Sequence, residues 1–285
     1  MKDNKDFNTW LAGLIEGDGC IVTPDTRKTH NRRNYPHIQI AFNKKDKELA
    51  MKIAAMVGGG SIDIFGNTVR LTWRKKADLL NLIERINGQM RTPKILRLQK
   101  LIDWYNEEDS TKIEKKNLDL SPIGSNSWLS GISDADSNFN IILTNRGNSY
   151  RVQRQWRLEI SQRTYHGSEQ YSWALLVSAF INSNLLSRHR LLDFTDGEIV
   201  VNGPPSIGSC IYSTWGIVAH SQESIKKIEE YLNCYPLYSS KYLDYKDWKN
   251  CGLITEKSKE NYEKVVYIKS GMNNRRTHFT WDHII

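Results

Sequence analysis

Two ten-residue segments of this chain are near copies of one another, and they constrain its fold more than any other feature. Residues 10–19 read WLAGLIEGDG, and residues 128–137, which start 118 positions later, read WLSGISDADS. Each is predicted to form a short apolar helix with small residues four positions apart and an acidic residue at its C-terminal end. Positions four apart share a helix face, so two such helices can pack closely. The duplication predicts two pseudo-symmetric halves, with two carboxylates at their joint.

The length of 285 residues suits two domains or one duplicated domain. Its formal net charge is +8, which suits a polyanionic partner. No apolar run approaches the roughly 20 residues that span a bilayer, so we expect no membrane partner. Residues 1–6 resemble neither a signal peptide nor an Arg-rich transit peptide. We therefore expect the protein to act where it is made, unless its start has been trimmed.

The four cysteines have spacings that match neither a zinc ribbon nor a redox pair. We interpret them as free thiols in a reducing compartment. They are Cys20, Cys210, Cys234 and Cys251.

The repeat extends beyond the two helices, because each half is predicted to follow the order α-β-β-α-β-β-α-α. The first half has strands at 20–23 and 37–42, a helix ending near Gly58, a hairpin at 61–65 and 68–74, and helices over 79–86 and from 92 onward. The second half has strands at 138–146 and 150–162, a helix over 173–181 with Ser168 as N-cap, strands at 187–201 and 207–220, and helices over 225–232 and from 239 onward. We expect a first repeat at 1–110, a linker at 111–126, and a second repeat with a C-terminal extension at 127–285.

The paired motifs resemble those of the LAGLIDADG homing endonucleases, in the monomeric form that carries both copies in one chain. Residues 11–19 read LAGLIEGDG and residues 129–137 read LSGISDADS, and the order of the downstream elements also fits. The resemblance implies an α+β fold of two pseudo-symmetric repeats. In each, an antiparallel sheet forms a saddle packed under helices, and the two motif helices join the repeats.

The acidic ends of the motif helices are candidate metal ligands. A carboxylate is unfavourable at a helix C-terminus, and two of them repel one another, so divalent cations would relieve both costs. Mg²⁺ suits one or two carboxylates together with waters and substrate phosphates. The alternative is that each aspartate only caps a turn, but the duplication favours metal binding. The resemblance implies that Asp18 and Asp136 bind the metal with help from the carbonyls of Gly17 and Ala135. It also implies that Mn²⁺ or Ca²⁺ can replace Mg²⁺, with Ca²⁺ not supporting cleavage.

Other residues are assigned through the resemblance. Lys94 and Lys241 each open the last helix of their repeat, where a cation runs against the helix dipole, and both are candidates for ordering water near a phosphate. Lys44 and Gln162, paired by the offset of 118, match a further pair of polar active-site positions in the family. Glu16 and Asp134 fill the sixth motif position, where the acid is usually peripheral to the chemistry.

Candidate DNA contacts lie on the predicted strands. In residues 150–161 apolar side chains alternate with Arg and Gln, and Arg154 is the exception on the apolar face. Since one face of such a sheet packs on helices, the other is free for Arg and Gln to read base edges in the major groove. The alternative is an ordinary solvated face, which usually mixes Lys with Glu. Candidate contacts are Arg27, Lys28, Arg32, Arg33, His37, Gln39, Arg70, Thr72, Arg74, Asn138, Asn140, Thr144, Arg146, Arg151, Gln153, Gln155, Arg157, Arg188 and Arg190.

The resemblance implies a monomeric, intron-encoded, mitochondrial endonuclease that cuts both strands of a long asymmetric DNA site and leaves 3′ overhangs. The first alternative is a maturase, which uses this fold to bind intron RNA. The presence of both motif aspartates favours the nuclease, whereas Ser133 and Ser137 weaken the second motif. The third possibility is a DNA-binding regulator built on a degenerate copy of the fold. An added helix-turn-helix domain would support it, but only the tail is long enough to contain one.

Overall fold

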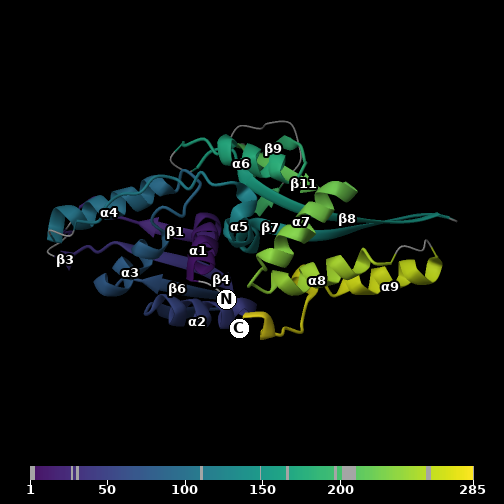
Figure 1. Cartoon of the computed structure of the whole chain (residues 1–285), viewed down its shortest axis with the longest axis horizontal. Helices are drawn as coiled ribbons and strands as arrows, with labels where there is room; N and C mark the ends of the chain where they lie inside the picture. Colours follow the sequence, from purple (N-terminus) through teal and green to yellow (C-terminus); the bar gives the residue numbers. More distant parts are fainter. Residues whose placement is uncertain are drawn as a thin grey trace.

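The computed structural model describes residues 4–26, 28–29, 32–109, 112–147, 149–164, 167–195, 198–200, 210–254 and 258–284. Two helices, α1 (Asn4–Asp18) and α5 (Trp128–Asp136), lie side by side at the centre. The first half of the chain extends to one side of them and the second half to the other (Figure 1). The predicted joint at the motif helices is therefore the centre of the molecule.

The first half contains a four-stranded antiparallel sheet in the order β1-β4-β6-β5. Its strands are β1 (Gly19–Val22), β4 (His37–Asn43), β5 (Ser61–Phe65) and β6 (Thr68–Trp73). A small separate hairpin, β2 (Lys28–Thr29) with β3 (Arg32–Arg33), precedes β4. The helices are η1 (Lys44–Asp46), α2 (Lys47–Val57), α3 (Lys76–Ile86) and α4 (Ile95–Asp109).

The second half repeats this arrangement around a larger sheet, in the order β10-β9-β11-β8-β7. Its strands are β7 (Ser137–Arg146), β8 (Ser149–Ser161), β9 (Leu185–Thr195), β10 (Glu198–Val200) and β11 (Cys210–Ala219). Its helices are η2 (Ile123–Ser125), α6 (Tyr171–Phe180), α7 (Gln222–Cys234), α8 (Lys241–Cys251), α9 (Lys259–Ser270), η3 (Asn273–Arg275) and η4 (Asp282–Ile284). The tail beyond Gly252 is thus partly helical.

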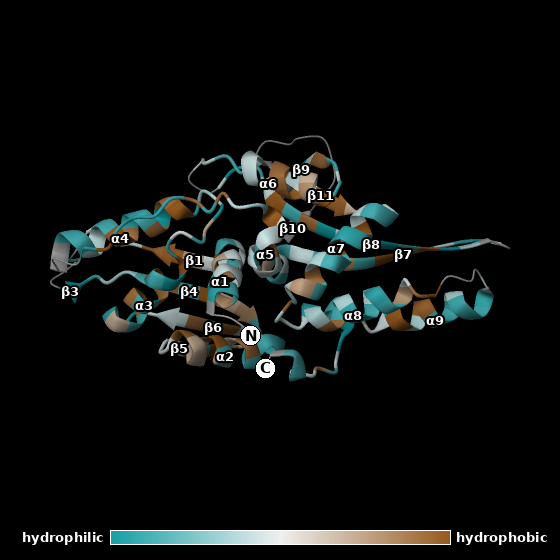
Figure 2. Ribbon diagram, in the orientation of Figure 1, coloured by the Kyte–Doolittle hydropathy of each residue, from teal (hydrophilic) through white to brown (hydrophobic). Residues whose placement is uncertain are grey.

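Each sheet has one buried and one open face, because its strands alternate as the sequence predicted. In β8, Trp156, Leu158 and Ile160 are buried, and the residues between them are partly exposed. In β4 the buried positions are Ile38, Ile40 and Phe42. Figure 2 shows the apolar residues concentrated where sheets meet helices. The open faces remain available for a partner.

The glycines of the motif helices allow the two backbones to touch. A Cβ built on Gly13 would lie 2.3 Å from the Trp128 carbonyl oxygen, and one on Gly131 would lie 1.9 Å from that of Trp10. A Cβ on Gly17 would lie 2.2 Å from the Ala135 Cβ. Real Cβ atoms do not approach so closely, so the small residues are required by packing, as the four-residue spacing predicted.

Some predicted details are wrong. Gln170, not Ser168, occupies the N-cap of α6, and the Ser168 amide instead donates to the Thr164 hydroxyl. The strand predicted at 187–201 consists of β9 and β10.

Three of the four cysteines, Cys20, Cys234 and Cys251, are free thiols, while the side chain of Cys210 lies outside the described residues. Among the helices that the structure describes, none has the length and apolarity to cross a membrane.

Candidate active site at the joint of the motif helices

The two motif aspartates end neighbouring helices. Asp18 is the last residue of α1, and Asp136 is the last residue of α5. A Cβ on Gly17 would lie only 2.9 Å from Asp136 Oδ2, so the end of one helix adjoins the carboxylate of the other. Both aspartates keep access to solvent, and in the described part of the chain no hydrogen bond reaches either carboxylate. Two open carboxylates with free lone pairs therefore meet at the joint.

The electrostatic cost of this arrangement is visible in the pKa of each carboxyl group. Partial enclosure by protein, followed by repulsion from Asp136, raises the pKa of Asp18 to about 6. Enclosure also raises the pKa of Asp136, while Lys241 and Lys94 act in the opposite direction. Without a cation between them, the two charges are poorly compensated, which is the condition that a divalent ion relieves.

The two lysines lie against the ends of the same helices. Lys94 Nζ donates to the carbonyls of Ile15 (3.0 Å), Gly17 (3.2 Å) and Gly19 (2.8 Å). A cation is favourable at a helix C-terminus. Burial lowers the pKa of Lys94, and neighbouring acids partly offset this. The ammonium group thus lies beside the joint, in contact with a carbonyl proposed as a metal ligand.

Lys241 repeats this geometry in the second half. Its Nζ donates to the carbonyls of Ser133 (3.3 Å) and Ala135 (2.5 Å), and burial lowers its pKa. The offset of 118 relates Ser133 to Ile15 and Ala135 to Gly17, so the two lysines bind equivalent oxygens. The lysine candidates are therefore brought to the carboxylates symmetrically.

The sixth-position acid of each motif holds the turn that carries the lysine of its own repeat. Glu16 accepts hydrogen bonds from the backbone N–H groups of Arg91 and Thr92, at 2.9 and 2.6 Å. It also accepts from the indole of Trp128 in the opposite motif helix, at 2.5 Å. Because Glu16 is buried, its pKa is raised. One carboxylate thus joins both motif helices to the Lys94 turn.

Asp134 makes the corresponding contacts in the second half. It accepts from the backbone N–H groups of Tyr238 (2.8 Å) and Ser239 (3.1 Å), and from the Trp10 indole at 2.8 Å. Burial raises its pKa as well. Sequence reasoning assigned the sixth-position acids to the periphery of the chemistry and missed this positioning role. The signal available was an acid within an otherwise apolar helix, which must find buried donors.

The donor set suits a hard divalent cation. The joint offers two carboxylates and the carbonyls of Gly17 and Ala135, which already accept hydrogen bonds from ammonium groups. Mg²⁺ and Ca²⁺ prefer such oxygens. The described residues contain no group of three or more His, Cys, Asp or Glu side chains arranged to hold a metal. Any ion at the joint would therefore complete its coordination with water or substrate oxygens.

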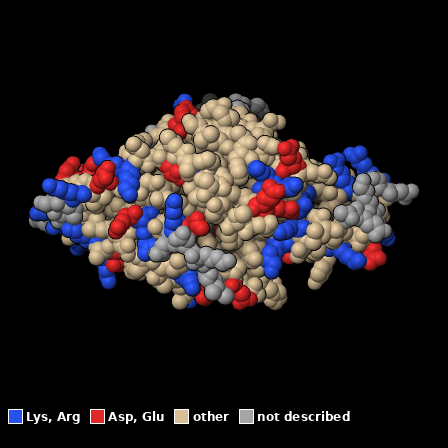
Figure 3. All heavy atoms as spheres, in the orientation of Figure 1, with Lys and Arg blue, Asp and Glu red and all other residues tan. Residues whose placement is uncertain are grey.

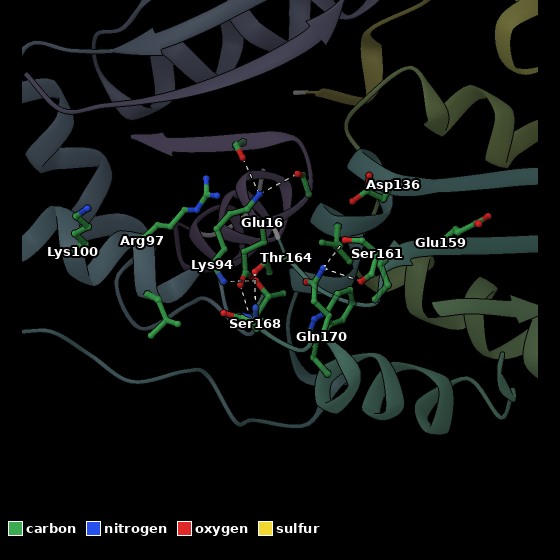
Figure 4. Close-up of a pocket in the computed structure, with 18 residues that line it drawn as sticks. Glu16, Lys94, Arg97, Lys100, Asp136, Glu159, Ser161, Thr164, Ser168 and Gln170 are labelled. Carbon is green, nitrogen blue, oxygen red and sulfur yellow. Dashed lines mark hydrogen bonds between the residues drawn. The ribbon is translucent and has the colours of Figure 1, made fainter. Parts of the chain in front are cut away.

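A cleft of about 580 Å³ opens beside Lys94 and Asp136. Lys94, Arg97 and Lys100 line it from the Lys94 turn and α4, and Thr164 and Gln170 line it from the second half (Figure 4). In that view the Lys94 side chain points toward the carbonyls at the end of α1, and Asp136 lies across the cleft. The cleft combines cations with an acidic joint, which suits a phosphodiester.

Comparison with known proteins identifies the family. The sequence profile of the family described as LAGLIDADG endonuclease matches residues 11–105 and 209–252. The chain is 31% identical to the intron-encoded DNA endonuclease aI3 of Saccharomyces cerevisiae, over all of this chain and 76% of that protein. The chain belongs to the LAGLIDADG endonuclease family. As in the sequence-based interpretation, it carries two LAGLIDADG motifs.

Two further comparisons bear on fold and function. The LAGLIDADG meganuclease I-AabMI, solved bound to uncleaved DNA, has the same fold, with a TM-score of 0.67 at 19% identity over 94% of this chain and 99% of that one. The intron-encoded RNA maturase bI4 of S. cerevisiae is 26% identical over 58% of this chain but only 24% of that protein. The predicted α+β fold of two repeats is confirmed.

The four-stranded and five-stranded sheets carry most of the residues predicted to contact DNA, on their open faces. The β7–β8 register places Asn138 opposite Arg157 and Asn140 opposite Gln155. Arg154, the exception on the apolar face, lies over the Trp248 ring at 4.6 Å and pairs with Glu229. Its burial against α7 and α8 explains why the alternation breaks there.

In the first LAGLIDADG sheet, Gln39 pairs with Thr72 and lies on the same face as Arg70. Thr72 is only 3% exposed, because this short side chain lies on a central strand between Gln39 and Ser61. The expectation that Thr72 is accessible on that face is therefore corrected. His37 is partly buried, and this burial, followed by the charge of Arg74, lowers its pKa.

Charged side chains also occupy the ends of the molecule. Lys28, Arg32, Arg33 and Arg74 are exposed in the first half, as are Arg146 and Arg151 in the second. Figure 3 shows Lys and Arg gathered toward both ends of one face, with acids among them. Thr144, Gln153 and Arg188 are partly exposed on their strands. Arg27 and the side chain of Arg190 lie outside the described residues.

Among the described residues, no hydrogen bond or ion pair joins Lys44 or Gln162 to the motif aspartates. Lys44 begins η1 and is exposed. Gln162 donates from Nε2 to the Ser187 hydroxyl at 2.7 Å and to the Thr214 carbonyl at 3.3 Å. The assignment of Lys44 and Gln162 to the active site stays a prediction.

Proposed function

We propose that this protein is a site-specific DNA endonuclease that hydrolyses one phosphodiester in each strand of a long, asymmetric duplex and leaves 3′ overhangs. The observation that carries the proposal is the meeting of Asp18 and Asp136 between two equivalent lysines. A target of about two helical turns, one for each repeat, would match the two sheets. Because both motif helices belong to one chain, the proposal also makes the active protein a monomer.

In this proposal each group of residues has a separate role in catalysis or in DNA binding. Mg²⁺ held by Asp18, Asp136 and the carbonyls of Gly17 and Ala135 would neutralise charge at the phosphorus and activate water. Lys94 and Lys241 keep positive charge beside the carboxylates, where a strand's phosphate would lie. Glu16 and Asp134 fix the lysine turns through buried hydrogen bonds. The polar sheet faces would hold the duplex in register.

The proposal is tested by Mg²⁺-dependent cleavage of a randomised duplex library, with Asp18→Asn and Asp136→Asn as variants. We expect double-strand cuts at one recurrent sequence, and no cuts by either variant. Substitution of Ca²⁺ for Mg²⁺ should preserve binding without cleavage. Tight DNA binding without any Mg²⁺-dependent cutting by the unmodified protein would reject the nuclease function.

A second candidate function is that of an intron RNA maturase, which is favoured by the likeness to the protein named RNA maturase bI4. Retention of both motif aspartates and both lysines supports DNA cleavage as the first function. Binding of intron RNA by a protein that does not cut DNA would support the maturase instead. The names of the relatives as intron-encoded proteins support an organellar, mitochondrial location.

A further inference from the structure

The two lysine turns share the hydrogen bonds that hold them to their motif helices, and they differ in the residue that precedes the lysine. The turns 91–94 and 238–241 each receive a buried carboxylate from their own motif helix. In each, the hydroxyl two residues before the lysine accepts from the lysine N–H: Thr92 to Lys94 at 3.3 Å and Ser239 to Lys241 at 3.2 Å. The residue between them is Pro93 in the first turn and Ser240 in the second.

This difference changes the hydrogen-bond requirement of the turn. Proline has no backbone N–H, so the first turn needs no acceptor at this position. Ser240 has an N–H and a hydroxyl, and it is itself buried. A buried donor without an acceptor is costly. The second turn therefore needs a partner that the first does not.

Asp46 of the other repeat supplies that partner. Its Oδ1 accepts from the Ser240 N–H at 2.6 Å, and its Oδ2 accepts from the Ser240 hydroxyl at 3.1 Å. Asp46 ends η1, directly after β4, and is 7% exposed. Thr164, which the offset of 118 pairs with Asp46, bonds instead to the Ser168 amide in its own loop. Among the described residues, the contact is thus present on one side of the pseudo-symmetric joint.

The charge of Asp46 acts on the active site as well as on the turn. Burial raises the pKa of Asp46, while hydrogen bonds from Ser240 and the charges of Lys45 and Lys241 lower it. Reciprocally, Asp46 is among the acids that support the protonated form of Lys241. Asp46 therefore lies next to the catalytic candidate of the opposite repeat, although the two are far apart in sequence.

We propose that Asp46 is a positioning residue that holds the Lys241 turn in place from the opposite repeat, and that it thereby controls cleavage of one of the two DNA strands. The proposal rests on the endonuclease function proposed above. It implies that the two active sites are unequal in their construction. A carboxylate of the opposite repeat holds the turn of Lys241. The turn of Lys94 meets the opposite repeat through Arg91, which lies over the Trp128 ring at 5.6 Å, but it has no such carboxylate among the described residues.

The test measures nicking of each strand separately, on a duplex with a different fluorophore on each strand and the target selected from the library. Lys94→Ala and Lys241→Ala first establish which strand each lysine serves. Asp46→Ala should slow nicking of the Lys241 strand by roughly tenfold or more, since small misplacements of a catalytic group are costly. The rate on the other strand and the DNA affinity should stay nearly unchanged.

A second variant distinguishes positioning from general damage. Asp46→Ala combined with Ser240→Pro removes the donor together with its acceptor and places proline before the lysine, as in the first turn. The φ angle of Ser240, −56°, already suits proline. This double variant should recover most of the rate on the Lys241 strand. Glu48→Gln, an exposed change two residues from Asp46, is the matched control and should leave both strands unaffected.

Hydrogen exchange gives a readout that does not depend on cleavage. Backbone amides of residues 238–243 should exchange faster in Asp46→Ala than in the unmodified protein, and those of residues 91–97 should not. Equal slowing of both strands, or no slowing of either, would overturn the proposal and leave the nuclease function intact. Failure of the unmodified protein to cut any duplex would instead reject the nuclease function and the inference with it.

Discussion

The Asp18 carboxylate is an unfavourable charge in the metal-free protein. Its pKa rises from the ordinary value of 3.8 to about 6, through enclosure and then repulsion from Asp136. The folded state thus binds this proton more tightly than the unfolded chain does. The resulting contribution to stability is fully present below pH 3.8 and is lost as the pH rises through 6. The same charge becomes useful when a cation lies beside it.

The substitution Asp18→Asn should therefore stabilise the metal-free protein at pH 8, because it removes both the enclosed charge and the repulsion. The gain should shrink as the pH falls below 6, where Asp18 is increasingly protonated in the unmodified protein. Thermal unfolding at pH 8 and pH 4.5, in the presence of a chelator, measures both effects. Asp63→Asn, on an exposed strand position, is the control and should show no such difference. A lower melting temperature for Asp18→Asn at pH 8 would contradict this account.

The affinity for a divalent cation should rise with pH, whereas the contribution of Asp18 to the stability of the metal-free protein falls with pH. A metal ligand must be deprotonated, so a proton on Asp18 competes with the ion. Calorimetric titration with Ca²⁺ should give weaker binding at pH 5.5 than at pH 7.5, with proton release near pH 6. In Asp18→Asn the binding should be much weaker at both pH values. An affinity that is the same at pH 5.5 and pH 7.5 would argue against Asp18 as a ligand.

At the scale of elements, the α1–α5 contact depends on the absence of a few atoms. Alanine is the better helix former by about 1 kcal/mol, yet a Cβ on Gly131 would lie 1.9 Å from the Trp10 carbonyl oxygen. Gly131→Ala should therefore destabilise the protein, by about 1–3 kcal/mol or more for an overpacked site. Urea unfolding measures this loss. Gly271→Ala is the control, since its Cβ would meet only the Ile268 carbonyl, at 3.6 Å.

The same elements show what sequence reasoning could and could not predict. Periodicity and duplication predicted the motif helices, the alternating strands and both lysine turns, because these patterns are local or repeat along the chain. The anchoring by Glu16 and Asp134 and the contact between Asp46 and Ser240 were not predicted. They depend on how distant segments pack. Arg154 could be noticed as an exception, but only its contacts with Glu229 and Trp248 explain it.

At the scale of the whole molecule, the two halves differ in the charges that surround the lysine helices. Counting from the lysine turns, Arg97 and Lys100 of α4 correspond to Asp244 and Asp247 of α8. The C-terminal tail compensates for this reversal of charge. Arg276 donates to Asp244 Oδ1 at 2.8 Å and to Asp247 Oδ2 at 2.5 Å. The tail continues beside the first half, where Lys45 lies over the Phe279 ring at 6.0 Å.

Loss of the Arg276 side chain should destabilise the protein strongly. Asp244 is 3% exposed at its side chain, and without Arg276 it keeps only the hydrogen bond from the Asn273 amide among the contacts of the described residues. Removing one partner of a buried pair typically costs about 3–5 kcal/mol. Arg276→Ala should therefore lower the urea midpoint clearly. Arg275→Ala, an exposed neighbour, should not.

A double-mutant cycle separates the ion pair from the packing of the tail. If the cost arises from an uncompensated charge, Asp244→Asn should restore much of the stability that Arg276→Ala loses, because a neutral amide is less costly to bury alone. If Arg276 acts mainly by packing, the two substitutions should be additive. The tail also reaches the Lys241 turn, where His283 Nε2 lies 3.3 Å from the Tyr238 carbonyl oxygen. The cycle can therefore be repeated with strand-resolved nicking. A loss of nicking rate on the Lys241 strand alone would show that the tail, like Asp46, helps to position Lys241.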